Sequence, residues 1–234
     1  MLGAVSLIPI PGIPEVCPGD DLARMIAAAA DDAGGLRDYD CLVVTQKIVS
    51  KAEGRLVPFD GSDEAKAALI ASESRRVLRQ RGVLRIAETN HGFICANAGI
   101  DLSNVEDGMA ALLPVDSDRS ARRIRDVLRS AGVTVAVIIS DTFGRPWRRG
   151  VTDVAIGVAG ISPVIDLRGT NDALGRELAV TEVCIADEIA AAAELVMGKS
   201  TGVPVAVVRG LNPEWFGTGA ITEVIRSSQD DLFR

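Results

Sequence analysis

A run of apolar residues interrupted only by Thr134, VTVAVII at residues 133–139, marks the expected centre of the fold of this 234-residue chain. A short apolar run of this kind is typical of a buried β-strand. The stretch that follows, SDTFGRPWRRG, brings an aspartate, a threonine and three arginines to the end of the expected strand. A core strand needs none of these groups, whereas a site for metal-bound phosphate uses all of them. The sequence therefore predicts a functional site where this strand ends.

The rest of the chain mixes expected strands and helices without strict alternation. Capping residues and apolar stripes predict helices at residues 21–35, 62–80, 116–132 and 181–197. Further strands are expected at residues 4–10, 41–45, 83–89, 92–99, 154–161, 163–169 and 203–210. This order favours an α+β fold over a doubly wound parallel sheet. No shift in composition marks a boundary, so residues 1–234 are expected to form a single domain, with a division into two subdomains left open.

Composition and charge argue against several classes of protein. The net charge of −7 and the pI near 4.9 argue against binding to nucleic acid. The apolar runs are far shorter than a membrane span, and the N-terminus lacks the basic start and cleavage site of a signal peptide. The four cysteines form no C-x-x-C pair, so we expect reduced core cysteines in a cytoplasmic protein.

The histidine content restricts the metals that the chain can bind. His91 is the only histidine, and no cysteine cluster replaces a histidine-based site, so a zinc centre of either kind is excluded. If a metal is present, its protein ligands must be mostly oxygen atoms. Oxygen ligands suit Mg²⁺ or Mn²⁺.

The first candidate site lies directly after the apolar run. Asp141 and Thr142 can both face a divalent cation, as in many phosphoryl-transfer sites. A helix N-cap or a turn would explain Asp-Thr alone. Arg145, Arg148 and Arg149 add planar forks that hold phosphate oxygens, and with them the sequence favours an anion or phosphate site.

The second candidate is ANAGIDLSN, residues 96–104. Asp101, Ser103 and Asn104 cluster after an expected strand, and Gly99 allows close approach of the backbone. Asp101 is a candidate for the second carboxylate on the metal of Asp141. A polar turn explains this stretch equally well.

The third candidate is TQKIVSKAEGR, which begins where the strand at residues 41–45 ends. It places hydrogen-bond donors and positive charge in an otherwise acidic protein, through Gln46, Lys47, Ser50, Lys51 and Arg55. Nucleotide phosphates would explain this pattern. A solvated loop or helix face explains it slightly better from the residues alone.

Two further stretches favour ordinary structural roles. MGKST, residues 197–201, follows a helix and precedes a strand, and residue 193 is alanine, so it does not satisfy the phosphate-binding pattern G-x-x-x-x-G-K-[ST]. We expect a helix C-terminus there, with Lys199 favourable near its negative end. The acidic residues of the preceding helix are expected on its solvated face; they are Asp187, Glu188 and Glu194.

Taken together, these stretches resemble the coenzyme F420-0:L-glutamate ligases, the γ-glutamyl ligases of deazaflavin coenzyme biosynthesis. The resemblance extends from about residue 7 to residue 210 and keeps the family order. It rests on the segments IPGIPEVCPGDDL, VVTQKIVSKAEGRLV, CANAGIDLSN, ISDTFGRPWRRGVTDVAIGVAG, TEVCIADEIAAAAEL and VPVAVVRG.

The resemblance implies GTP-dependent amide formation with divalent cations. GTP would phosphorylate the terminal carboxylate of coenzyme F420-0 or a related precursor, and the amino group of L-glutamate would then displace phosphate from the acyl phosphate. Further glutamates can be added through their γ-carboxylates. Two divalent cations, Mg²⁺ or Mn²⁺, are implied, and K⁺ is a further candidate.

The resemblance also assigns roles to residues of this chain. Asp101 and Asp141 correspond to ligands of one metal, and Thr142 to a contact with a second. The implied GTP contacts are Ile13, Pro14, Glu15, Val16, Gln46, Lys51 and Asn104. For catalysis we expect Asp141, Arg145 and Arg148. The stretch MGKSTG is shorter and less acidic than in some archaeal relatives, so no second-metal or guanine contact is assigned there.

The family fold is α+β, with mixed and antiparallel sheets, and forms an intertwined homodimer with the active site near the interface. In some bacteria a similar domain is fused to a flavin-binding, nitroreductase-like domain. The sequence, which ends at Arg234, resembles the stand-alone form. Without the resemblance, the residues favour only a metal-dependent phosphoryl-transfer enzyme, and a kinase, a phosphatase or a non-catalytic nucleotide-binding module remains an alternative.

Overall fold

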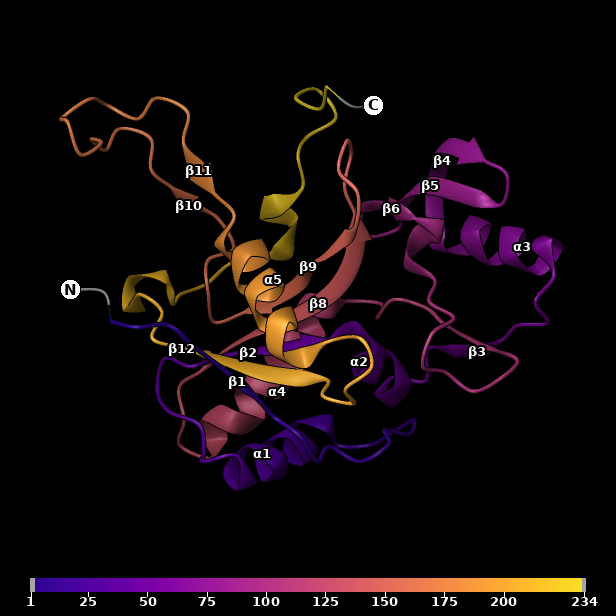
Figure 1. The fold of residues 1–234 in the computed structure, drawn as a ribbon, viewed down its shortest axis with the longest axis horizontal. Helices are drawn as coiled ribbons and strands as arrows, with labels where there is room; N and C mark the ends of the chain where they lie inside the picture. Colours follow the sequence, from indigo (N-terminus) through magenta and orange to yellow (C-terminus); the bar gives the residue numbers. More distant parts are fainter. Residues whose placement is uncertain (1–2, 233–234) are drawn as a thin grey trace.

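A mixed five-stranded sheet forms the centre of the computed structural model, which describes residues 3–232 (Figure 1). Its strand order is β1-β12-β2-β8-β9; the neighbours β2 and β8 pair in parallel, and the other neighbouring strands pair antiparallel. These strands are β1 (Ser6–Pro9), β12 (Val205–Arg209), β2 (Cys41–Thr45), β8 (Ala136–Gly144) and β9 (Val151–Ala159). The apolar runs of β2, β8 and β12 are buried throughout most of their length, as expected for strands covered on both faces.

Helices cover both faces of this sheet. Figure 1 shows α1 (Leu22–Asp32) and α4 (Ser117–Ser130) on one side of the sheet, and α5 (Ile185–Met197) on the other. Asp21 and Asp116 cap α1 and α4 by accepting hydrogen bonds from backbone N–H groups of the first turn. The α+β class is therefore confirmed.

Smaller elements surround the central sheet. A three-stranded sheet consists of β4 (Ser74–Arg81), β5 (Leu84–Thr89) and β6 (Ile94–Ala96). A short 3₁₀ helix, η1 (Asn97–Gly99), directly follows β6. Two strand pairs and two α-helices complete this part: β3 (Leu56–Pro58) with β7 (Met109–Ala111), β10 (Ile165–Asp166) with β11 (Glu182–Val183), α2 (Gln46–Ala52) and α3 (Asp63–Glu73). Near the C-terminus lie η2 (Pro213–Trp215) and η3 (Ile221–Val224).

The expected helix over residues 62–80 is wrong in its second half. The helix α3 ends at Glu73, and residues 74–81 form β4, which pairs with β5 around a turn at Gly82. Val77 is 45% exposed, so it does not continue an apolar helix stripe into the core. Gly82 has a φ of +58° and turns the hairpin, which explains why the sequence pattern stops there.

Other expectations need smaller corrections. Residues 46–52, for which a solvated loop or helix face was an alternative, form the helix α2, and Gln46 and Ser50 are buried in it. The helix α5 begins at Ile185, because residues 182–183 form β11. All four cysteines are free, but Cys17 is exposed and so is not a core residue. Within residues 3–232, no helix is long and apolar enough to cross a membrane.

Candidate functional site

A cleft of about 910 Å³ opens at the edge of the sheet where the pairing of β2 with β8 ends. Four segments approach it: the N-terminal loop, the start of α2, the loop after β6 and the loop between α5 and β12. Most of the predicted site residues line this cleft: Ile13, Pro14, Glu15, Val16, Gln46, Lys51, Asp101, Asn104, Asp141 and Thr142. Segments far apart in sequence therefore contribute to one site.

The strand β8 presents its polar residues in two directions. The sheet pairing of β2 and β8 ends at Thr45 and Ser140, but β8 continues to Gly144 alongside β9. Asp141 and Thr142 therefore lie inside a strand, not after its end as the sequence suggests. Because successive side chains of a strand point to opposite faces, these two residues take part in two different clusters.

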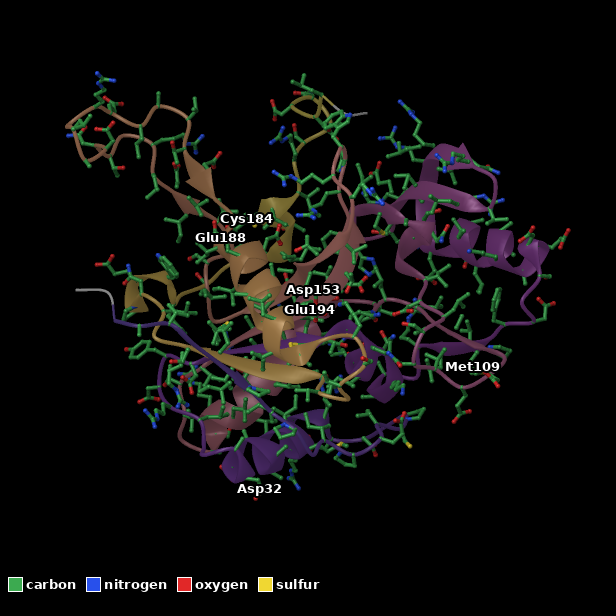
Figure 2. All side chains as sticks on the ribbon, viewed as in Figure 1. Asp32, Met109, Asp153, Cys184, Glu188 and Glu194 are labelled. Carbon is green, nitrogen blue, oxygen red and sulfur yellow. The ribbon has the colours of Figure 1, made fainter. Side chains whose placement is uncertain are left out.

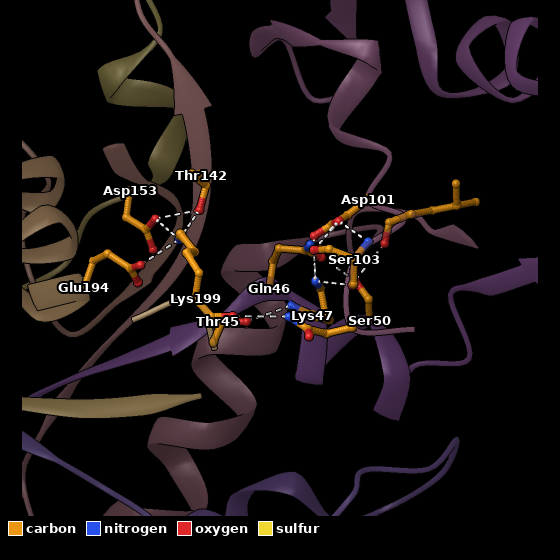
Figure 3. Close-up of polar contacts among 12 residues, drawn as sticks. Thr45, Gln46, Lys47, Ser50, Asp101, Ser103, Thr142, Asp153, Glu194 and Lys199 are labelled. Atoms are coloured by element: carbon orange, nitrogen blue, oxygen red, sulfur yellow. Dashed lines mark hydrogen bonds and ion pairs between the residues drawn. The ribbon is translucent and has the colours of Figure 1, made fainter. Parts of the chain in front are cut away.

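The first cluster joins Asp101 to the start of α2 (Figure 3). Lys47 Nζ lies 2.7 Å from Asp101 Oδ2, and Ser103 donates from its N–H (2.7 Å) and its hydroxyl (2.8 Å) to Asp101 Oδ1. Burial raises the pKa of Asp101, but these hydrogen bonds outweigh it and hold the pKa below its usual value. Asp101 is therefore a carboxylate fixed in place at the cleft.

Asp141 is the carboxyl group whose pKa is most clearly raised. Burial raises its pKa from 3.8 to about 7, against a hydrogen bond from the Thr142 N–H, and the charges of Asp101 and Asp153 raise it further. A half-buried carboxyl group that feels the charges of two other carboxylates is in surroundings that favour an added cation. Perturbed groups of this kind in a cleft are typical of functional sites.

The second cluster surrounds Lys199 (Figure 3). Its Nζ lies 2.5 Å from Thr142 Oγ1, 2.9 Å from Asp153 Oδ1 and 2.9 Å from Glu194 Oε1. The Thr142 hydroxyl donates to Asp153 Oδ1 (2.6 Å), and Ser140 Oγ lies 3.1 Å from Asp153 Oδ2. Burial lowers the pKa of Lys199, but the hydrogen bonds to the two carboxylates raise it more, so the side chain stays an ammonium.

The predicted nucleotide contacts occupy the cleft wall next to α2. Lys51 Nζ pairs with Glu15, which places the N-terminal loop against this helix. Gln46 is buried, with Oε1 2.9 Å from Ser50 Oγ, while Asn104 is exposed in the loop after β6. The cleft thus contains Lys47, Lys51 and Lys199, which are three of the four lysines in the sequence.

Arg145 and Arg148 lie outside this lining. Both are exposed at the tip of the hairpin between β8 and β9. Their predicted catalytic role stays a prediction, because it requires a contact with substrate.

The sequence reasoning missed three cleft residues, Asp153, Glu194 and Lys199. Glu194 was expected on a solvated face, but Figure 2 shows it near Asp153 at the centre of the molecule, whereas Glu188 on the same helix lies farther along α5. For Asp153 the sequence did offer a signal. If β8 and β9 form a hairpin, Asp153 faces Thr142, and facing strand residues meet on one side of the sheet.

Asp187 was also expected on the solvated face of α5. Its Oδ1 instead accepts a hydrogen bond from Ala155 N (2.9 Å), so this carboxylate ties the helix to β9.

The donor set fits a divalent cation that keeps part of its water or substrate shell. Among residues 3–232, no group of three or more His, Cys, Asp or Glu side chains is placed to hold a metal by itself. Asp101 and Asp141 nevertheless supply two carboxylates to one cleft. Mg²⁺ is commonly bound in proteins through one or two carboxylates together with waters and substrate phosphates.

Known proteins are similar to this chain over nearly its whole length. A family model described as F420-0:Gamma-glutamyl ligase matches residues 12–210. The coenzyme F420:L-glutamate ligase of Methanothermobacter thermautotrophicus is 43% identical over 251 residues, covering 98% of this chain and 99% of the relative. Proteins of the same name from Methanopyrus kandleri (41% identical, 100% and 99% covered) and Archaeoglobus fulgidus (42% identical, 98% and 96% covered) are also similar. The chain therefore belongs to the F420-0:gamma-glutamyl ligase family and is an enzyme of the ligase class.

Proposed function

We propose that the protein joins L-glutamate to coenzyme F420-0, or to a related precursor, in a GTP-dependent reaction that forms an amide bond. The observation that carries this proposal is the cleft in which Asp101, Asp141 and three lysines lie together. All of these residues except Lys199 come from the segments that carry the family resemblance. Three similar proteins bear the name of this activity.

The proposed reaction has two steps. A carboxylate oxygen of the precursor attacks the γ-phosphorus of GTP, and the bond from that phosphorus to the β–γ bridging oxygen breaks, which releases GDP. The amine of L-glutamate then attacks the acyl carbon, the carbon–oxygen bond to phosphate breaks, and the amide and inorganic phosphate form. The amine loses its protons to water. Such phosphoryl chemistry depends on positioning and on charge neutralisation.

The lysines of the cleft are suited to hold phosphate. Lys47 and Lys51 are now paired with Asp101 and Glu15, and phosphate oxygens can replace these carboxylates as partners. Asp101 and Asp141 would hold a divalent cation, which would neutralise phosphate charge when bound. Arg145 and Arg148 are proposed to reach the transferring phosphoryl group from the hairpin tip.

We further propose that the protein acts as a homodimer. The family resemblance motivates this, and the arm formed by β10, β11 and residues 167–181 extends away from the body (Figure 1). Leu174 and Val180 on this arm are 83% and 85% exposed, and contact with another chain would bury them. Light scattering on the purified protein tests the state; a monomer would contradict it.

An assay with omitted components tests the proposed function. Purified protein is incubated with coenzyme F420-0, L-glutamate, GTP and Mn²⁺, and mass spectrometry reads the product. We expect added glutamyl units whose number the spectrum gives, and no product without GTP or metal. Asp141→Asn should abolish the product, while Asp31→Asn, at an exposed site on α1, should not.

Other outcomes of this assay point to the alternatives. GTP hydrolysis without glutamate addition would support a phosphoryl-transfer enzyme with another acceptor. GTP binding without any turnover would support a nucleotide-binding module. Product formation by Asp141→Asn at the wild-type rate would refute the metal assignment.

A further inference from the structure

Lys199 is held by three oxygen atoms in a manner that resembles a bound cation. Its Nζ contacts Thr142 Oγ1 (2.5 Å), Asp153 Oδ1 (2.9 Å) and Glu194 Oε1 (2.9 Å). The Thr142 hydroxyl uses its proton for Asp153, so a lone pair is left to face the ammonium. These three residues come from β8, β9 and α5, so the position is built by the fold and not by one loop.

The charges at this position require a cation. The Asp153 side chain is only 5% exposed and that of Glu194 only 21%, and both carboxylates contact the same nitrogen. Two such carboxylates repel each other when no cation lies between them. Among the residues that the structure describes, the ion pairs give these carboxylates no other cationic partner.

The Lys199 ammonium reaches this position from the loop after α5. Gly198 ends the helix with a φ of +62°, a left-handed conformation that suits glycine, and Lys199 follows it. The Lys199 side chain is 56% exposed, so the lysine approaches from the open side of the cleft. The carboxylates, by contrast, are fixed in the sheet and the covering helix.

We propose that the Lys199 ammonium fills the cation position formed by Thr142, Asp153 and Glu194 and stands there in place of a second divalent ion. This inference rests on the proposed function for its catalytic meaning, since Thr142 is the residue for which the resemblance implies a second metal. The cleft then needs one divalent ion, at Asp101 and Asp141, together with one cation tethered to the chain. Removal of the tethered charge should open the position to a free ion.

Counting bound Mn²⁺ tests this inference. The nucleotide-free protein is titrated with Mn²⁺, and the free ion is measured by electron paramagnetic resonance. We expect Lys199→Met to bind one more Mn²⁺ than the wild type, and Lys199→Arg, which keeps the charge, to bind the wild-type number. In the double variant Lys199→Met/Glu194→Gln, the affinity for the additional ion should fall at least tenfold.

A matched variant separates the position of the lysine from the mere loss of one positive charge. Lys66→Met removes a lysine of α3, outside the cleft lining, and should leave the count unchanged. If Lys199→Met does not fold, as judged by circular dichroism, Lys199→Ala replaces it. Equal counts for the wild type and the folded Lys199 variant would overturn the inference.

The same titration separates this inference from the proposed function. Asp141→Asn should lose the Mn²⁺ assigned to Asp101 and Asp141. If Asp141→Asn loses no ion, the metal site of the proposed function fails, whereas the inference on Lys199 depends only on the difference between the Lys199 variants and the wild type.

Discussion

Replacing Asp141 by asparagine should stabilise the metal-free protein at alkaline pH, although it should destroy the metal site. Burial and the neighbouring carboxylates raise the pKa of Asp141 to about 7, whereas in the unfolded chain it is near 3.8. Between these two values, the unfolded chain loses its proton while the folded protein keeps it. The free energy of unfolding is therefore highest, as far as this group is concerned, below about pH 4. It falls as the pH rises from about 4, and the loss is complete once the pH has passed the folded-state pKa of about 7.

The magnitude follows from the pKa difference. Each pKa step corresponds to about 1.4 kcal/mol, so the wild type loses on the order of 4 kcal/mol once the pH exceeds 7. Asparagine has nearly the same shape and no charge to desolvate, so the variant avoids this loss. Between pH 5 and pH 8, the advantage of Asp141→Asn over the wild type should grow by about 3 kcal/mol.

Urea unfolding in the presence of EDTA measures this difference at both pH values. Asp31→Asn, which replaces an exposed aspartate of α1, is the matched control and should follow the wild type at each pH. Addition of Mn²⁺ should then raise the midpoint of the wild type but not that of Asp141→Asn. The reasoning is refuted if the free energies of unfolding of the variant and the wild type differ by the same amount at pH 5 and pH 8.

Three further substitutions test separate parts of the structure. Lys51→Ala should raise the KM for GTP about tenfold or more, because it removes a charge-assisted contact to phosphate. Lys66→Ala is the control, and an unchanged KM in Lys51→Ala would contradict the role of Lys51 in binding GTP. Arg148→Ala should lower kcat about 10- to 100-fold, because it removes the proposed contact with the phosphoryl group. Its melting temperature should stay unchanged, because the side chain is exposed, and unchanged kinetics would remove this arginine from the mechanism. Gly157→Ala should lower the free energy of unfolding by about 1–3 kcal/mol, because its Cβ would lie 2.5 Å from the carbonyl carbon of Ser117 in α4. Gly144→Ala, with open space around its Cβ, should cost little, and equal losses in urea unfolding would contradict the close packing.

Sequence patterns locate the central strands and the main helices. The apolar run at residues 41–45 becomes β2, and the run at residues 133–139 overlaps β8, which begins at Ala136 and continues to Gly144. The capping aspartates Asp21 and Asp116 mark the starts of α1 and α4. These patterns succeed because buried strands and capped helices depend on local residue choice. The segment 74–81 fails because its few apolar residues fit either period, and pairing with β5 decides its conformation.

The candidate site is only partly readable from sequence. Asp101 and Asp141 stand in polar motifs next to strands, so residue type and place suffice to identify them. Glu194 and Lys199 lie in a helix and a loop whose sequences fit ordinary structural roles. They become site residues only when α5 packs on the sheet and brings them to Asp153, and no local pattern encodes that contact.

The most direct test of the proposed chemistry follows one oxygen atom. Coenzyme F420-0 labelled with ¹⁸O in its terminal carboxylate is incubated with GTP, L-glutamate, Mn²⁺ and the wild-type protein, and the released phosphate is analysed by mass spectrometry. An acyl phosphate transfers one carboxylate oxygen to phosphate, so we predict one ¹⁸O in the phosphate released for each amide formed. Amide formation with unlabelled phosphate would contradict phosphoryl transfer to the carboxylate.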